Sequence, residues 1–310
     1  MRFFSEDQVR SAMKADEVIR AIRAAFTRGF ATVHMPVRTA LELDGAILLI
    51  MPCYDSGLQA AGIKLVSVSE KAGVNAVYEL LDPSTGISVA RMEANYLTDL
   101  RTAATSAVAT DLLARKNVKT LGIFGSGRQA VAHLAVLPRV RTFRQFLVCG
   151  SGRSDLNAFC AKMKIEFAID IEPASAEMVT QESDVICTCT TSPVPLFDGN
   201  WLRPGTHLNL VGAFQPETRE VDDTVVKRAR VVVDTYEGSL QEAGDLLIPI
   251  RNHVIDRGHI IADLHEIAAG KKPGRRNADE ITLFKSVGCA LEDLVAAQLI
   301  DNSQLANSKN

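Results

Sequence analysis

The spacing of apolar residues changes several times along the chain, and it begins with helices. Apolar residues recur at the spacing of one helix face over the first thirty residues: Val18, Ile19, Ile22, Ala25 and Phe26. Ser5 and Gln8 precede them and fit a capping box, in which two side chains satisfy the first backbone N–H groups of a helix. We therefore expect two helices over residues 5–30.

After Pro36 the pattern becomes that of strands. Two pairs of strand-like segments flank short turns, with one more strand between them: 37–43 and 46–51 around Asp44-Gly45, 62–69, and 76–81 and 87–92 around 82–86. The first ~95 residues are therefore expected to form helices packed on an antiparallel sheet.

The remainder alternates between strands and helices. Thr98 is the expected N-cap of a long helix from Asp99 to about Lys116. Strands are then expected over 119–124, 145–149, 166–169, 184–189, 207–211 and 230–234. Helices are expected over 128–137, 154–164, 174–181, 221–228 and 236–243, with a final helix over 288–300. Alternation at this spacing predicts a doubly wound parallel sheet.

A glycine motif lies where the first of these strands runs into a helix. Gly125-Ser-Gly-Arg-Gln-Ala130 has the spacing Gly-x-Gly-x-x-Ala. Gly125 permits a tight turn, Gly127 lets the backbone approach a pyrophosphate, and Ala130 allows close packing of helix on strand. The helix N-terminus also favours phosphates. The motif predicts a dinucleotide site, and the alternative is an ordinary turn.

The turn after the second strand bears on the choice of cofactor. NAD binding usually uses an acidic residue about 20 residues after the glycines to hold the ribose 2′-hydroxyl. Here Cys149 is followed by Gly-Ser-Gly-Arg-Ser, with no carboxylate. Ser151, Arg153 and Ser154 instead offer donors for a 2′-phosphate. This favours NADPH, with NADH as the second choice, against the alternative of a solvated loop.

Composition narrows the class of protein. The chain has 310 residues, of which 47% are hydrophobic, and a net charge of −3. That charge gives no field for nucleic acid or an anionic membrane, and no apolar run approaches the ~20 residues of a membrane helix. The six cysteines form no C-x-x-C pair and the six histidines no zinc spacing, so we expect no metal. The N-terminus does not resemble a signal peptide, and a cytoplasmic location is expected.

Three cations stand where a cation is unusual. Arg38 begins a strand, Lys64 interrupts an apolar strand, and Arg101 is expected in the first turn of the long helix, where the dipole favours anions. An unpaired buried lysine would be costly. A shared anion such as a substrate carboxylate would account for all three. The alternative is that each has an ordinary salt-bridge partner.

Several motifs in order along the chain resemble the ornithine cyclodeaminase/μ-crystallin family. They are Met35-Pro-Val-Arg38, Gly62-Ile-Lys-Leu-Val66, Leu100-Arg-Thr-Ala-Ala-Thr-Ser-Ala107, residues 125–130, Thr190-Thr-Ser-Pro193, Val211-Gly-Ala-Phe-Gln-Pro216, Phe284-Lys-Ser-Val-Gly288 and Ala290-Leu-Glu-Asp293. The resemblance implies an α/β fold in which a Rossmann-type doubly wound parallel sheet is inserted into an α+β substrate and dimerisation domain. The implied boundaries are 1–115 completed by 287–310, and 116–286 for the NAD(P)-binding domain.

The resemblance also implies site residues and a homodimer. Arg38, Lys64 and Arg101 would be the catalytic and substrate-binding cations, with Phe214 as a further substrate contact. The Thr190-Thr191 and Ser286-Val287-Gly288 loops would flank the ribose and nicotinamide. The candidate cofactor residues are Gly125, Ser126, Gly127, Arg128, Gln129, Ser151, Arg153, Ser154, Thr190, Thr191, Val211, Ser286 and Gly288.

One position separates the reactions found in this family. Deaminating and dehydrogenating members carry a catalytic Asp where this chain has Phe214. Phenylalanine cannot accept protons or hold substrate amines. Its apolar ring instead resembles the members that reduce cyclic imines, unless another carboxylate such as Glu217 or Asp222 substitutes.

The expected activity is therefore the NAD(P)H-dependent reduction of a cyclic ketimine carboxylate. The expected reactions convert Δ1-pyrroline-2-carboxylate to L-proline or the six-membered Δ1-piperideine-2-carboxylate to L-pipecolate. Arg38 and Arg101 would clamp the carboxylate, and Lys64 would complete the clamp and relay a proton. Ornithine cyclodeaminase or alanine dehydrogenase activity is the alternative within the family. A non-catalytic NADP or small-ligand carrier is the alternative of another class.

Overall fold

The chain folds into two compact units. This computed structural model describes residues 1–69, 71–152 and 155–307. The first unit comprises Met1–Thr105 and Gly288–Asn310, and the second comprises Ser106–Val287. The division falls inside helix α3 (Asn95–Leu113), ten residues before the boundary expected from the sequence. In the described part of the chain, no helix has the length and apolar character needed to cross a membrane.

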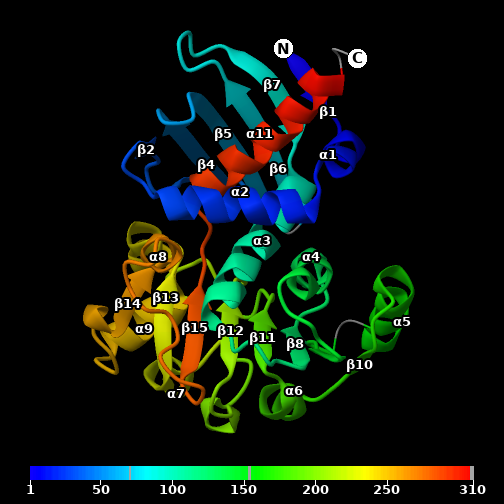
Figure 1. The fold of residues 1–310 in the computed structure, drawn as a ribbon, viewed down its shortest axis with the longest axis vertical. Coiled ribbons are helices and arrows are strands. Elements are labelled where there is room, and N and C mark those ends of the chain that lie inside the picture. The colour runs from blue at the N-terminus through cyan, green and yellow to red at the C-terminus, as the bar shows by residue number, and fades with distance from the viewer. Residues whose placement is uncertain (70, 153–154, 308–310) are drawn as a thin grey trace. The chain divides into compact units, whose positions relative to one another are not determined.

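The first unit is built on a mostly antiparallel sheet (Figure 1). Its strands in spatial order are β1 (Arg2–Phe4), β7 (Ser88–Glu93), β6 (Gly73–Leu81), β5 (Ala60–Ser69), β4 (Ala46–Asp55) and β2 (Val33–His34), with β3 (Thr39–Leu43) also paired to β4. The β3–β4 and β6–β7 hairpins were both expected. Only β1 pairs in parallel among the described strands of this sheet, next to β7.

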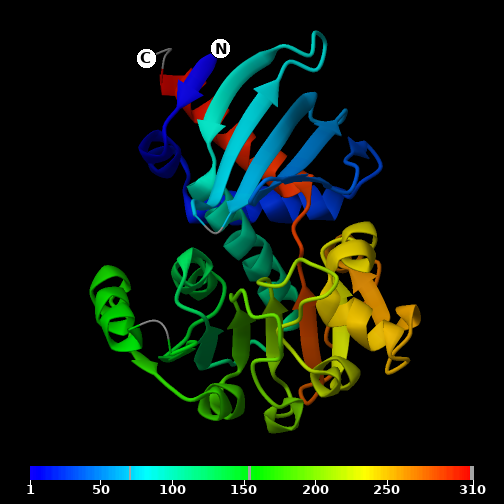
Figure 2. The same cartoon turned by 180° about the vertical axis from the view of Figure 1, so that it is seen from behind.

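One face of this sheet is buried under helices. The helices are α1 (Glu6–Ala12), α2 (Ala15–Arg28) and α11 (Ala290–Asn307). Figure 1 shows α2 and α11 lying across the sheet, and Figure 2 shows its opposite face with the strands in front. Buried residues alternate along β5, where Ala60, Gly62, Lys64 and Val66 point to the covered face. This alternation places Lys64 beneath α11.

The second unit is a parallel sheet with connecting helices (Figure 1). Its strands in spatial order are β10 (Ile171–Pro173), β9 (Gln145–Cys149), β8 (Thr120–Phe124), β11 (Val185–Thr188), β12 (His207–Leu210), β15 (Ile281–Lys285), β13 (Ala229–Val233) and β14 (Ile260–Asp263). Its helices are the end of α3, α4 (Arg128–Val136), α5 (Leu156–Phe167), α6 (Ala176–Glu182), α7 (Asp223–Arg228), α8 (Tyr236–Glu242), α9 (Gly244–Arg251), α10 (Leu264–Ala268), and the 3₁₀ turns η1 (Leu137–Arg139), η2 (Gly199–Trp201) and η3 (Arg257–His259).

The strand order reverses between β8 and β11. From β8 the chain moves outward to β9 and β10, and then returns to place β11 on the other side of β8. In doubly wound sheets, ligands bind beyond the carboxyl ends of the strands at such a switch point. The expected Rossmann-type fold is confirmed, and its switch point lies at Gly125 and Cys189.

Two local expectations were wrong. Residues 166–169 form no strand, because α5 continues to Phe167 and ends at Ala168 in the left-handed conformation (φ 53°). Thr98 is not the N-cap of α3, since that helix begins at Asn95. The side chain of Asn95 accepts a hydrogen bond from the backbone N–H of Ala76 (2.9 Å), which ties the helix start to β6.

Candidate functional site

The turn after β8 has the geometry that a pyrophosphate requires. Gly125 has φ +112°, and a Cβ added there would lie 2.6 Å from the carbonyl oxygen of Cys189. Its N–H donates to the Cys149 carbonyl (2.8 Å). Gly127 is the N-cap of α4, and an added Cβ there would meet nothing within 4 Å. A side chain is therefore excluded at Gly125 by the protein, whereas the space beside Gly127 is open to a ligand.

The neighbouring residues of the motif divide into exposed and packed groups. Arg128 is exposed, Ser126 and Gln129 are half-buried, and Ala130 is fully buried against the sheet. Ser151, in the turn after β9, is exposed as well. Arg153 and Ser154, on which the expected NADPH preference depends, lie outside the described residues.

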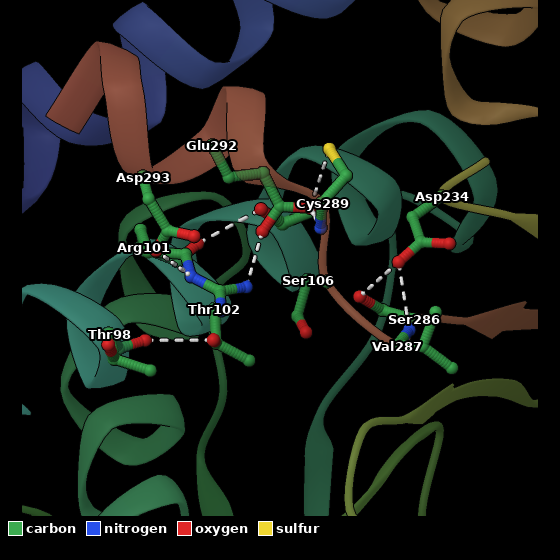
Figure 3. A network of polar contacts seen from close by, with 12 residues as sticks. Thr98, Arg101, Thr102, Ser106, Asp234, Ser286, Val287, Cys289, Glu292 and Asp293 are labelled. Carbon is green, nitrogen blue, oxygen red and sulfur yellow. Dashed lines mark hydrogen bonds and ion pairs between the residues drawn. The ribbon is translucent and has the colours of Figure 1, made fainter. Parts of the chain in front are cut away.

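The side chains of two predicted cofactor residues are committed to protein partners. The Thr190 hydroxyl lies 2.7 Å from Oε1 of the buried Glu220. The Ser286 hydroxyl donates to Oδ2 of Asp234 (2.9 Å), which also accepts the Val287 N–H (Figure 3). The Thr190 and Ser286 hydroxyls therefore hold the conformation of their own loops.

The other predicted positions of these loops are more open. Thr191 is exposed and Val211 is half-buried at the end of β12. Gly288 belongs to the first unit instead. The structure thus brings most of the predicted cofactor residues to the carboxyl edge of the parallel sheet, and leaves Gly288 with a different set of neighbours.

Lys64 is buried in the first unit and has an acidic partner. Only 1% of the residue is exposed, and its Nζ lies 2.7 Å from Oδ2 of Asp293 on α11. Burial, and then the charge of Arg101, lower the pKa of Lys64 to about 8, although Asp293 opposes the shift. Lys64 is therefore an ammonium that can release a proton near neutral pH.

Arg101 shares the same acidic partner and has a second one. Its Nε donates to Oδ1 of Asp293 (2.9 Å), and its Nη1 lies 2.6 Å from Oε2 of Glu292 (Figure 3). Burial works to lower the pKa of Arg101, but Asp293 and Glu292 outweigh it and raise that pKa above its ordinary value. Because α3 begins at Asn95, Arg101 lies in the second turn rather than the first, so the expected opposition to the helix dipole was wrong.

Gly288 connects Arg101 with Arg38. Nη2 of Arg38 donates to the Gly288 carbonyl oxygen (3.0 Å). Gly288 has φ +81°, and an added Cβ would lie 2.6 Å from Nη1 of Arg101. A glycine is therefore required here both by the backbone and by the guanidinium beside it.

The three predicted cations are thus brought together, with two acids that sequence reasoning missed. Arg38, Lys64 and Arg101 lie together with Glu292 and Asp293. We call these five residues the cation cluster. Its acids could have been found in the sequence as two adjacent carboxylates opening an otherwise apolar helix over 290–297.

Nearly the whole chain matches a known protein family. The family model described as "Ornithine cyclodeaminase/mu-crystallin family" matches residues 2–308. The chain belongs to the ornithine cyclodeaminase/mu-crystallin family. The expectation drawn from the sequence motifs is confirmed.

Three members of the ornithine cyclodeaminase/mu-crystallin family illustrate the similarity. The structure of Thermococcus litoralis Δ1-pyrroline-2-carboxylate reductase in complex with NADH and L-proline has a TM-score of 0.96 and 38% identity, covering 99% of this chain and 98% of that one. A Δ1-pyrroline-2-carboxylate reductase of Bacillus cereus is 35% identical, over 97% of this chain and 95% of the relative. The ketimine reductase mu-crystallin of Rattus norvegicus is 33% identical, over 97% and 96%.

Within this ornithine cyclodeaminase/mu-crystallin family member, Phe214 lies in the loop after β12. It is half-buried and packs against the apolar core of the second unit. The two carboxylates considered as substitutes for the family's aspartate are otherwise placed. Asp222 caps α7 by accepting the Val225 N–H (2.9 Å), and the Glu217 side chain is 75% exposed.

Proposed function

We propose that this protein reduces cyclic ketimine carboxylates with a nicotinamide cofactor, converting Δ1-pyrroline-2-carboxylate to L-proline. The six-membered homologue Δ1-piperideine-2-carboxylate is the proposed second substrate. The cation cluster carries the proposal, because it brings two guanidinium groups and an ammonium together, and these groups bind carboxylates well. The similarity to named Δ1-pyrroline-2-carboxylate and ketimine reductases supports it.

In the proposed mechanism the cations bind and orient the substrate. Arg38 and Arg101 hold the carboxylate and direct C2 of the imine toward the cofactor, an effect of positioning. When bound, NAD(P)H supplies the hydride that C2 receives. The proposed pyrophosphate site at Gly125 and Gly127 fits such a cofactor, because the turn is tight and the space beside it is open.

Lys64 is the proposed source of the proton. Its pKa of about 8 allows it to protonate the ring nitrogen, which makes C2 more electrophilic, and Asp293 at 2.7 Å holds the ammonium in place. Phe214 is the proposed apolar contact for the ring. Hydride at C2 and a proton at nitrogen together convert the C=N bond into the secondary amine of the product.

The finer features of the proposal concern the cofactor and the assembly. We infer a preference for NADPH from the absence of a carboxylate in Cys149-Gly-Ser-Gly, although the T. litoralis relative is complexed with NADH. We infer a cytoplasmic homodimer. The exposed Leu41 and Leu43 of strand β3, each about half accessible, support the dimer, and sedimentation at twice the chain mass would check it.

The decisive experiment measures oxidation of NADPH and of NADH with Δ1-pyrroline-2-carboxylate, alongside formation of ammonia and proline from ornithine and deamination of alanine. Imine-dependent oxidation with little ornithine or alanine turnover is the expected result. Ammonia release from ornithine without imine reduction would replace the proposal with a cyclodeaminase. Tight binding of NADPH without turnover of any substrate would replace it with a ligand carrier.

A further inference from the structure

Glu220 is a buried carboxylate in the loop between β12 and α7, and it gathers hydrogen bonds from two other segments. No part of the residue is exposed. Oε1 lies 2.8 Å from the N–H and 2.7 Å from the hydroxyl of Thr190. Oε2 lies 2.7 Å from the Thr188 hydroxyl, and 2.8 and 3.2 Å from the N–H groups of Gly212 and Ala213. These five contacts bind together the carboxyl ends of β11 and β12.

A second buried carboxylate and a buried lysine contact the same loop as Glu220. Oδ1 of the buried Asp245 accepts the backbone N–H groups of Glu220 (2.7 Å) and Val221 (3.1 Å). Lys285, which ends β15 and is also fully buried, lies with its Nζ 2.8 Å from Oδ2 of Asp245 and 2.5 Å from the Ala213 carbonyl oxygen. One network therefore joins the ends of β11, β12 and β15.

The contacts fit an ionised Glu220. Burial and the charge of Asp245 raise the pKa of Glu220, whereas Lys285 and the threonine hydroxyls oppose that shift. Three of the five donors are backbone N–H groups, which cannot turn round to accept a proton from a neutral carboxyl group. Gly212 has no room for a side chain, since an added Cβ would lie 2.4 Å from Oε1 of Glu220.

We propose that Glu220 is a positioning residue for the nicotinamide end of the cofactor site. The proposal rests on the proposed function. Glu220 fixes Thr190 and Ala213, and the next residues along each loop, Thr191 and Phe214, are those proposed to contact the cofactor and the imine ring. Because the carboxylate fixes two loops at once, its loss releases both. The turn at Gly125, the proposed site of the pyrophosphate end, keeps its own backbone bond to Cys149.

The test compares two nucleotides in the variant Glu220→Gln. ADP carries the adenosine and pyrophosphate of NADH without the nicotinamide riboside. The glutamine amide has an NH2 group in place of one carboxylate oxygen, so at least one backbone N–H loses its acceptor. The NADH dissociation constant is expected to rise about tenfold or more. The ADP dissociation constant is expected to stay within about twofold. Both are measured by titration calorimetry on the purified full chain.

Asp184→Asn is the matched control. Asp184 directly precedes β11, at the end of the strand opposite to Thr188, and accepts the N–H groups of Lys119 (2.6 Å) and Thr120 (3.1 Å). This variant is expected to melt at a lower temperature and to keep the wild-type ratio of NADH to ADP affinity. Equal weakening of both nucleotides in Glu220→Gln would show general loosening and overturn the proposal.

Thr188→Val is the second variant, and it keeps the proposal testable if Glu220→Gln does not fold. It removes one donor to Glu220 with little change of shape, and the NADH dissociation constant is expected to rise about threefold with ADP unchanged. An unchanged NADH affinity in Glu220→Gln, or in Thr188→Val where Glu220→Gln does not fold, would overturn this inference alone. Failure of the wild-type protein to bind NADH or NADPH would overturn the proposed function with it.

Discussion

The two units satisfy their buried charges in different ways. In the cation cluster of the first unit, Lys64 and Arg101 are paired with Asp293 and Glu292, so charge meets opposite charge on side chains. At the carboxyl edge of the second unit, Glu220 is satisfied by three backbone N–H groups and two hydroxyls. Lys285 and Asp245 form a separate ion pair beside it.

This difference separates side-chain ion pairs, which can exchange partners, from backbone hydrogen bonds, which must stay fixed. A guanidinium or ammonium paired with a protein carboxylate can donate some of its hydrogen bonds to a substrate carboxylate instead. Backbone N–H groups around a carboxylate have no such freedom, because moving them moves the loops. The cation cluster is therefore suited to binding a substrate, and the contacts around Glu220 are suited to holding loops in place. Three predictions test the role of the cation cluster.

The largest effect is expected from Arg101→Lys. Lysine retains the positive charge but loses the planar pair of donors that a carboxylate matches, so kcat/KM for the imine should fall by about 100-fold, equivalent to about 2.7 kcal/mol. Steady-state kinetics measure this, with circular dichroism to establish folding. Full kcat/KM in a folded Arg101→Lys protein would remove Arg101 from the proposed clamp.

A smaller effect is expected on the pH profile. Since the pKa of Lys64 is lowered to about 8, its positive charge is present below that pH and lost above it, and kcat/KM should decline as pH rises through about 8. In Lys64→Arg the charge persists but the guanidinium does not give up its proton, so kcat/KM should be low at every pH and the limb near pH 8 should be absent. A limb at the same pH in both proteins would assign the titration to another group.

The smallest effect is expected from Gly288→Ala. Both Gly288 (φ +81°) and Gly86 (φ +71°) have left-handed backbones, but only at Gly288 would a Cβ meet Arg101, whereas at Gly86 it would meet nothing within 4 Å. Each alanine variant should lose roughly 1–2 kcal/mol of stability. Only Gly288→Ala should also raise KM for the imine, by about fivefold. Equal KM values in the two variants would mean that Arg101 moves aside freely.

Local signals predicted much of the fold. The glycine spacing at 125–130 needs only one strand and one helix to be recognised, and it predicted the turn that the structure shows. The hairpin at Asp44-Gly45 likewise follows from two adjacent residues and the alternation around them. In each case the residues that make the contact are neighbours in the sequence.

Contacts between residues far apart in the sequence could not be predicted from local patterns. Asp293 lies 229 positions after Lys64 and 192 after Arg101, and nothing in the local pattern of either shows that they share it. Helix α3 begins at Asn95, whose side chain bonds to β6, and not after the expected cap at Thr98. Strand β15 was missed for the same reason, because its neighbours β12 and β13 precede it by some fifty residues or more.

The position of α11 after the second unit in the sequence has a consequence for synthesis on the ribosome. Glu292 and Asp293 are translated only after the whole second unit, while Lys64 and Arg101 emerge long before it. Until α11 is made, burying those two cations in the first unit would leave them without their carboxylates, at a high cost in free energy. The nascent first unit must therefore stay open until α11 has been made, whereas residues 106–287 already contain every described strand of their own sheet.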